Sequence, residues 1–169
     1  EGGLMLPVAL KPERAEAPIS LVLNLNYGIC KDICIPVDAE LAIEIAPDET
    51  ERLSIPGELA LEAVPRSQDN LRAGDPQLVS AAGSLSSAPS AITITVRFPK
   101  GVKGADVFLE APGSPYLPLP EPIKKEDDDT LVYEARFGED VDVVQLSGKV
   151  MTITMVSETG ASSATFLVR

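Results

Sequence analysis

The chain contains two cysteines, Cys30 and Cys34, with three residues between them. In an extended strand these two positions would lie roughly 13 Å apart, which is too far for a disulfide. A disulfide between them therefore requires a turn or a helical curl. Gly28 before the pair and Pro36 after it favour such a bend, so we expect the cysteines to lie within disulfide distance on a bend between two strands.

A cysteine pair with this spacing can serve several purposes. As a structural staple it would close a very short loop, which stabilises a fold by only about 2 kcal/mol in the chain-entropy model. A strained and locally closed disulfide is easier to reduce, which suits a redox carrier. The spacing therefore favours thiol–disulfide exchange and leaves a staple, a metal site and two free buried thiols as alternatives.

A metal site built on this pair would have few ligands. Two thiolates can hold the soft ion Cu(I), and copper carriers of the Sco type have a similar Cys-three-residues-Cys segment followed by Pro. Those carriers also need a distant histidine and a thioredoxin-like α/β fold, whereas this chain contains no histidine. Zinc would need four ligands. We therefore expect no metal and no cofactor besides the redox-active disulfide, with a copper-handling protein as one rival interpretation.

The composition excludes other kinds of chemistry. A chain without histidine cannot build Ser-His-Asp or Cys-His nucleophile sites. Lys and Arg number 14 against 26 Asp and Glu, and the resulting net charge of −12 repels nucleic-acid backbones and anionic lipid heads. No stretch reaches the roughly 18 apolar residues of a membrane-spanning helix. Nucleic-acid binding and membrane insertion of this segment are therefore not expected.

Apolar and polar residues alternate with a period of two in several short segments, which is typical of β-strands. The clearest case predicts one buried face made of Ile92, Ile94, Val96 and Phe98. The 15 prolines and 12 glycines argue against long helices, and a short helix is expected only at residues 54–64. The expected strand segments are 4–10, 19–27, 40–45, 92–98, 107–109, 131–137, 150–156 and 164–168.

These elements predict an all-β protein with β-sandwich architecture and a short helical linker. Because residues 66–76 are polar and rich in Gly and Pro, they provide the best domain boundary. We divide the chain into a cysteine-bearing part (1–50), a linker with the helix (51–75) and a second sandwich (76–169). The acidic run 126–129 should form a solvated hairpin tip, because it lacks the spacing and the glycine of a calcium loop.

The cysteine segment resembles the N-terminal periplasmic domain of the DsbD family of thiol:disulfide interchange proteins, in the form common in alphaproteobacteria and related to ScsB. The resemblance covers most of the chain, but it is specific only around the cysteines. The residues that carry it are Leu6-Pro7-Val8, Tyr27-Gly28-Ile29-Cys30 and Cys34-Ile35-Pro36, followed in the second part by the segments 106–110 and 116–120.

The resemblance implies periplasmic, immunoglobulin-like sandwich modules and protein-disulfide reductase activity. The cysteine pair would receive electrons from a membrane-embedded thiol reductase domain and pass them to thioredoxin-like periplasmic proteins. Cys34 matches the cysteine that forms the mixed disulfide with partners, and Cys30 matches its resolving partner. Tyr27 matches an aromatic residue three positions before the first cysteine, and Pro36 matches the proline two positions after the second.

The chain departs from the family pattern in two ways. The better-known members have five residues between the cysteines, and the family's capping loop lies upstream of the strand that opens this chain. We therefore expect an incomplete first sandwich with an exposed edge. Lys31 favours a thiolate at Cys30 and Asp32 opposes it, so the sequence does not set the redox poise. The rival from another class is a non-catalytic binding or scaffold module with a structural disulfide.

Overall fold

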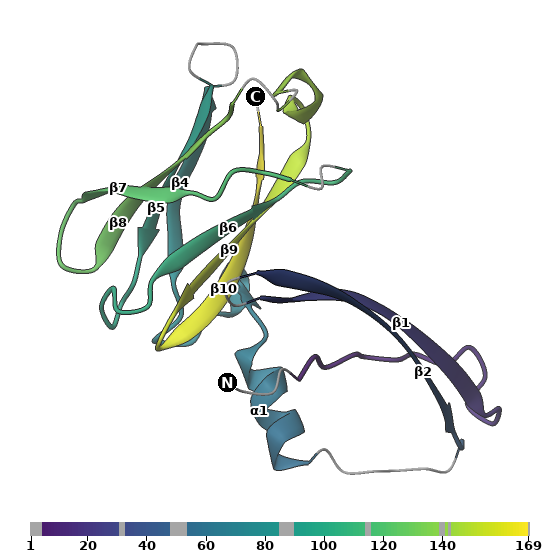
Figure 1. Ribbon diagram of the computed structural model, residues 1–169. Helices are drawn as coiled ribbons and strands as arrows, with labels where there is room; N and C mark the ends of the chain where they lie inside the picture. Colours follow the sequence, from purple (N-terminus) through teal and green to yellow (C-terminus); the bar gives the residue numbers. More distant parts are fainter. Residues whose placement is uncertain are drawn as a thin grey trace. The chain divides into compact units, whose positions relative to one another are not determined.

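The computed structural model divides into two compact units, residues 1–61 and residues 62–169 (Figure 1). It describes residues 5–30, 33–47, 54–84, 90–113, 116–138, 141 and 143–168. Within these residues, strands make up most of the regular structure and there is one α-helix. The protein is therefore all-β, as the sequence predicts.

Unit 1 (residues 1–61) contains a long β-hairpin made of β1 (Ile19–Cys30) and β2 (Cys34–Ile45). The strands pair antiparallel without a register shift along their whole length. Both strands extend beyond the alternating segments, because backbone pairing does not depend on alternation and continues through Gly28 and Pro36. The first sandwich expected here is represented, within the described residues, by this one two-stranded layer.

The short helix expected after the hairpin is α1 (Ile55–Ala63). The Ser54 hydroxyl accepts a hydrogen bond from the Gly57 N–H at 3.3 Å, which satisfies one of the free donors of the first turn. Pro56 lies in that first turn, where its missing N–H is not needed. The helix ends shortly before Pro65, which cannot continue it.

Unit 2 (residues 62–169) contains two four-stranded sheets (Figure 1). Its strands are β3 (Arg66–Ser67), β4 (Gln77–Ser84), β5 (Ala91–Arg97), β6 (Asp106–Glu110), β7 (Glu121–Lys125), β8 (Thr130–Arg136), β9 (Val150–Ser157) and β10 (Gly160–Leu167). The sheet orders are β4-β5-β8-β7 and β3-β10-β9-β6. All neighbours are antiparallel except β3, which pairs parallel with β10.

This strand order defines the class of the fold. Across the first sheet, β4, β5, β8 and β7 occupy the places of strands A, B, E and D of a constant-type immunoglobulin domain. In the opposite sheet, β6, β9 and β10 occupy the places of strands C, F and G. Unit 2 is therefore an immunoglobulin-like β-sandwich, with β3 added at the outer edge of the second sheet.

The hydrophobic core of unit 2 lies between its two sheets. The predicted buried face is confirmed, because none of its four side chains is more than 1% exposed: Ile92, Ile94, Val96 and Phe98. The facing sheet contributes the alternate residues of β9, which are equally buried: Met151, Ile153 and Met155. In both strands the period-two pattern selects the side chains that point inward.

The boundary between the units lies between Leu61 and Glu62, earlier than the end of the predicted linker at residue 75. Polar contacts hold residues 66–75 in unit 2. The buried Asp75 carboxylate accepts a hydrogen bond from the Arg72 N–H at 2.7 Å and pairs with Arg66 at 3.6 Å. A breaker-rich composition predicted a linker because it does not reveal such long-range contacts.

A second polar cluster joins the same segment to β10 and β4. The buried Ser162 hydroxyl donates to the Pro76 carbonyl at 2.6 Å and accepts from Gln68 Nε2 at 3.2 Å. Gln68 Oε1 in turn accepts a hydrogen bond from the Leu78 N–H at 2.9 Å. These buried polar groups are satisfied by one another, so the segment is fixed by hydrogen bonds rather than by apolar packing.

Several expectations for individual segments have clear outcomes. The acidic run 126–129 is a hairpin tip, as predicted, because it connects β7 to β8. The strand expected at residues 4–10 is wrong for its described part, since residues 5–10 adopt no strand. Strands β4 and β7 were not predicted, because β4 is rich in small residues and β7 contains Pro122. Their extended form comes from pairing with β5 and β8.

We predict that Gly160→Ala destabilises unit 2 by about 2 kcal/mol, through overpacking. A Cβ atom at this position would overlap Asp75 Oδ1 and lie 3.1 Å from Asp75 Cα. Because Asp75 is held in place by Arg66 and Arg72, it cannot move away without losing these contacts. Urea unfolding measures the change. Gly83→Ala is the control, since its Cβ would make ordinary 3.6 Å contacts; equal losses in both variants would contradict the prediction.

We predict that Tyr133→Phe stabilises unit 2 by about 1 kcal/mol, because a buried hydroxyl without a partner is costly. Tyr133 is 1% exposed, and its hydroxyl has no hydrogen-bond partner among the described residues. Burial, together with the charge of Asp106, raises the pKa of Tyr133 to about 12. The raised pKa stabilises the fold below the pKa of the unfolded phenol, and this contribution is lost as the pH rises toward 12.

The Phe variant should therefore also lose less stability than the original protein between about pH 10 and pH 12. Chemical denaturation at several alkaline pH values measures both effects. Tyr116→Phe is the matched control, because the Tyr116 side chain is exposed. A Tyr133→Phe variant that is less stable than the original protein at neutral pH would contradict this account.

Candidate functional site

The two cysteines lie at the tip of the β1–β2 hairpin. β1 ends at Cys30 and β2 begins at Cys34, and the two residues are direct partners in the register. Directly opposite Cα atoms in an antiparallel pair are about 4.5 or 5.5 Å apart, and both values fall within the range of disulfides. The bend that the spacing required is therefore present between the two strands.

Cys34 is disulfide-bonded. The sequence contains one other cysteine, Cys30, and the described residues include no free cysteine. Cys34 itself is exposed. A disulfide-bonded cysteine that is exposed at the end of a hairpin is accessible to a thiol of another protein.

Exposed isoleucines flank the cysteine pair. Ile33, in the connection between the strands, is 73% exposed, and the cross-strand partners Ile29 and Ile35 are 59% and 55% exposed. Large apolar side chains gain free energy when a partner covers them. The register directs Ile29 and Ile35 to the face opposite the cysteines, so the exposed apolar side chain in the connection itself is Ile33. The sequence places these isoleucines beside the cysteines but does not reveal that they are exposed.

The strand register places Gly28 and Pro36 on one face of the hairpin and Tyr27 on the other. Residues directly opposite each other in an antiparallel pair project to the same face, and successive residues project to opposite faces. Gly28 and Pro36 are partners of each other and share a face with the cysteines. Tyr27 pairs with Val37 and belongs to the other face, so the hairpin does not bring the tyrosine beside the sulfur atoms.

Gly28 and Pro36 fit their positions for steric reasons. Glycine opposite the proline ring leaves room for it across the pair. Proline lacks the N–H that a central strand would need, but each strand of a two-stranded sheet has an open edge where no donor is required. Lys31 and Asp32, which were expected to act on the cysteine pKa, lie outside the described residues.

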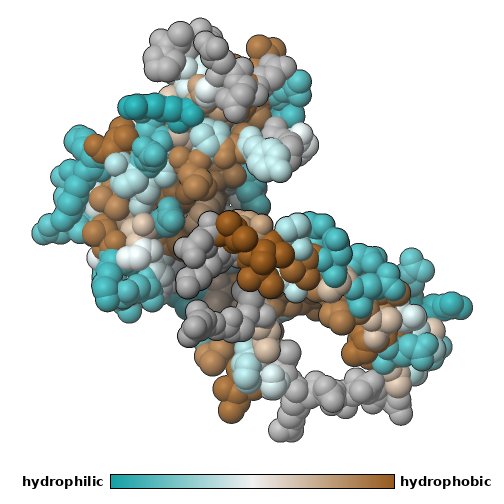
Figure 2. All heavy atoms as spheres, in the orientation of Figure 1, coloured by the Kyte–Doolittle hydropathy of each residue, from teal (hydrophilic) through white to brown (hydrophobic). Residues whose placement is uncertain are grey.

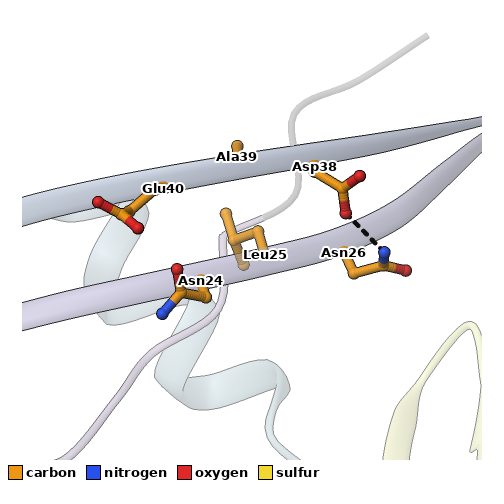
Figure 3. Close-up of a pocket in the computed structure, with 6 residues that line it drawn as sticks. All are labelled: Asn24, Leu25, Asn26, Asp38, Ala39 and Glu40. Atoms are coloured by element: carbon orange, nitrogen blue, oxygen red, sulfur yellow. Dashed lines mark hydrogen bonds between the residues drawn. The ribbon is translucent and has the colours of Figure 1, made fainter.

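The polar face of the hairpin carries acidic and amide groups further from the tip (Figure 3). Asn26 Nδ2 of β1 donates a hydrogen bond to Asp38 Oδ1 of β2 at 2.6 Å, and the next pair toward the base is Asn24 with Glu40. These residues line a shallow pocket in the middle of the hairpin. Asp38 is four residues from Cys34, roughly 13 Å along the strand, so salt screens its effect on the thiol.

The pocket is a poorer candidate for chemistry than the tip. Among the described residues, no three His, Cys, Asp or Glu side chains are grouped so that they could hold a metal ion. The pocket also contains no nucleophile, whereas the tip carries the disulfide. We therefore take the cysteine pair as the candidate site. In the part of the chain that the structure describes, no helix is long and apolar enough to cross a membrane.

Comparison with known proteins assigns no relative to this chain: no family model matches it, and neither a curated protein nor a solved structure is significantly similar to it. The fold and the site themselves define the class. The protein is an all-β chain in which an immunoglobulin-like sandwich follows a hairpin with a disulfide at its tip.

We predict that replacing both Cys30 and Cys34 by Ser loosens the hairpin tip but leaves unit 2 folded. The disulfide closes a very short loop, so its loss should cost about 2 kcal/mol locally, and amide exchange at residues 28–30, 34 and 35 should become up to about thirtyfold faster. Exchange in β5 and β9 should not change, because these strands belong to a separate core. Faster exchange throughout unit 2 would contradict this independence.

Proposed function

We propose that the Cys30/Cys34 pair is the redox-active group of a thiol–disulfide exchange module. The observation that carries the proposal is a disulfide-bonded, exposed Cys34 at the tip of a hairpin, next to the exposed Ile33 of the connection. A structural disulfide usually links distant segments and is shielded, because long loops and burial give it the greatest effect. This one closes a short connection, and its Cys34 is exposed.

The exchange reaction is balanced by the two cysteines alone. In the reduced module, one cysteine thiolate attacks a sulfur of the partner's disulfide, and the partner's other sulfur leaves as a thiolate. The second cysteine thiolate then attacks the first, which re-forms the disulfide of the module and releases the partner's remaining sulfur. The partner gains two electrons and two protons, and the module is oxidised by the same amount.

The direct cross-strand pairing of the cysteines suits the second step. Because Cys30 and Cys34 are opposite each other in the register, the resolving thiol is already close to the mixed disulfide. The hairpin ladder limits how far the two positions can separate after reduction. The module would therefore release a reduced partner quickly instead of remaining bound to it.

The resemblance noted for the cysteine segment supports a particular setting for this reaction. In that setting the module is periplasmic, a membrane-embedded thiol reductase domain reduces the pair, and thioredoxin-like periplasmic proteins receive the electrons. Cys34 would form the mixed disulfide and Cys30 would resolve it.

Trapping tests both the reaction and the roles of the cysteines. We predict that Cys30→Ser captures an oxidised thioredoxin-like protein as a stable mixed disulfide, because no thiol remains to resolve it, whereas Cys34→Ser captures none. Non-reducing gel electrophoresis and mass spectrometry detect the product. The double variant is the control. Capture by Cys34→Ser alone would reverse the two roles.

The reduction potential of the cysteine pair distinguishes a redox-active disulfide from a structural one. Equilibration of the original protein against a glutathione series should reduce the pair readily. A potential below about −300 mV would instead indicate a structural disulfide. That result, together with no capture by either single variant, would contradict the proposed function.

A further inference from the structure

The register divides the β1–β2 hairpin into two chemically different faces. Because directly paired residues share a face, every second pair of the ladder belongs to the same side of the sheet. On one side, all six pairs are apolar: Ile19–Ile45, Leu21–Ile43, Leu23–Leu41, Leu25–Ala39, Tyr27–Val37 and Ile29–Ile35. We call this side the apolar face. The other side carries the cysteines, Asn24, Asn26 and the carboxylates of Asp38, Glu40 and Glu44.

Within the described residues of unit 1, no segment covers the apolar face. None of its twelve residues is buried, and its central side chains Leu23, Leu41 and Ile43 are 47%, 57% and 60% exposed. Residues 5–18 are themselves largely exposed. The helix α1 makes no extensive contact with β1 or β2. Hydrophobic colouring is extensive on the visible surface of the hairpin in Figure 2.

The exposed area of the apolar face is close to the area that one partner contributes to a protein–protein interface. Six of its large side chains are about half exposed or more, and each leaves on the order of 100 Å² uncovered, which gives roughly 600 Å². The half-buried residues around them bring the face close to the roughly 800 Å² that each partner contributes to a standard protein interface. A hairpin with no second layer is also marginally stable in water.

The distribution of charge on the hairpin indicates what kind of partner surface can pack against the apolar face. The apolar face carries no charged residue, so it offers nothing for ion pairing with a charged partner. A second apolar sheet face, by contrast, would bury both surfaces without leaving a polar group unpaired. Face-to-face packing of sheets also keeps the layers about 10 Å apart, with Asp38, Glu40 and Glu44 directed to the two outer surfaces and away from each other.

We propose that the apolar face binds the same face of a second copy of this chain, so that two hairpins form a four-stranded, two-layered sandwich. Such an interface is self-complementary, as two-fold symmetry requires. Pairing of hairpin edges would not serve the same purpose, because it would join the strands and leave the apolar face exposed. In the face-to-face dimer the cysteines lie on the outer surfaces and stay accessible.

Sedimentation equilibrium of the whole chain over a wide micromolar range tests the proposal. We expect a reversible monomer–dimer equilibrium in the original protein, with no covalent dimer under denaturing, non-reducing conditions. Leu23→Glu should raise the dissociation constant by roughly a hundredfold or more, because dimerisation would bury an unpaired carboxylate. Leu41→Glu, at the cross-strand partner of Leu23, should have the same effect.

Val22→Glu is the matched control. Val22 is adjacent to Leu23, is 59% exposed and belongs to the opposite face, so this variant should remain a dimer. Hydrogen exchange of β1 and β2 in the original protein should also slow as the protein concentration rises, which gives a readout that does not depend on any variant. A monomer at all concentrations would overturn the proposal, and so would a dimer that Leu23→Glu and Leu41→Glu leave intact.

Discussion

The in-register pairing of β1 with β2 is the constraint on which the candidate site depends. It places Cys30 opposite Cys34, and it collects all of the alternate apolar residues on one side of the sheet. A slip by one residue would move every side chain of one strand to the other face and separate the two cysteines. The disulfide at the tip and the apolar face thus favour the same register, the first through a covalent bond and the second through burial.

The two units achieve stability by different physical means. Unit 2 encloses its own core, in which alternate residues of β5 and β9 face each other. Polar contacts around Asp75 and Ser162 hold the segment before β4 against the sandwich. Unit 1 has no comparable core among its described residues. Its hairpin relies on the ladder and on the disulfide, so a second apolar layer would supply the missing hydrophobic contribution.

This difference suits a division of labour. A thiol–disulfide exchange site must be accessible and must tolerate the loss of its own disulfide in each cycle. An exposed cysteine at the end of a two-stranded hairpin would meet the first requirement, and a separately stabilised sandwich would keep the rest of the protein folded when the disulfide is reduced. The buried hydroxyl of Tyr133 shows that the core of unit 2 is not optimised for stability alone.

The sequence alone was enough to predict the strands that have one buried face and the bend that brings the two cysteines together. Period-two patterns identify Ile92–Phe98 and the strand at β9 because one face of each is buried, and the spacing of the cysteines requires a bend. It did not determine β4 or β7, whose small residues and proline carry no such pattern and become strands only through their neighbours. Nor did it place residues 66–75, which belong to unit 2 through contacts with partners as distant in sequence as Ser162. The strand order of the sandwich and the exposure of the apolar face emerge only in the folded chain, because pairing between distant segments and burial are properties of the whole fold.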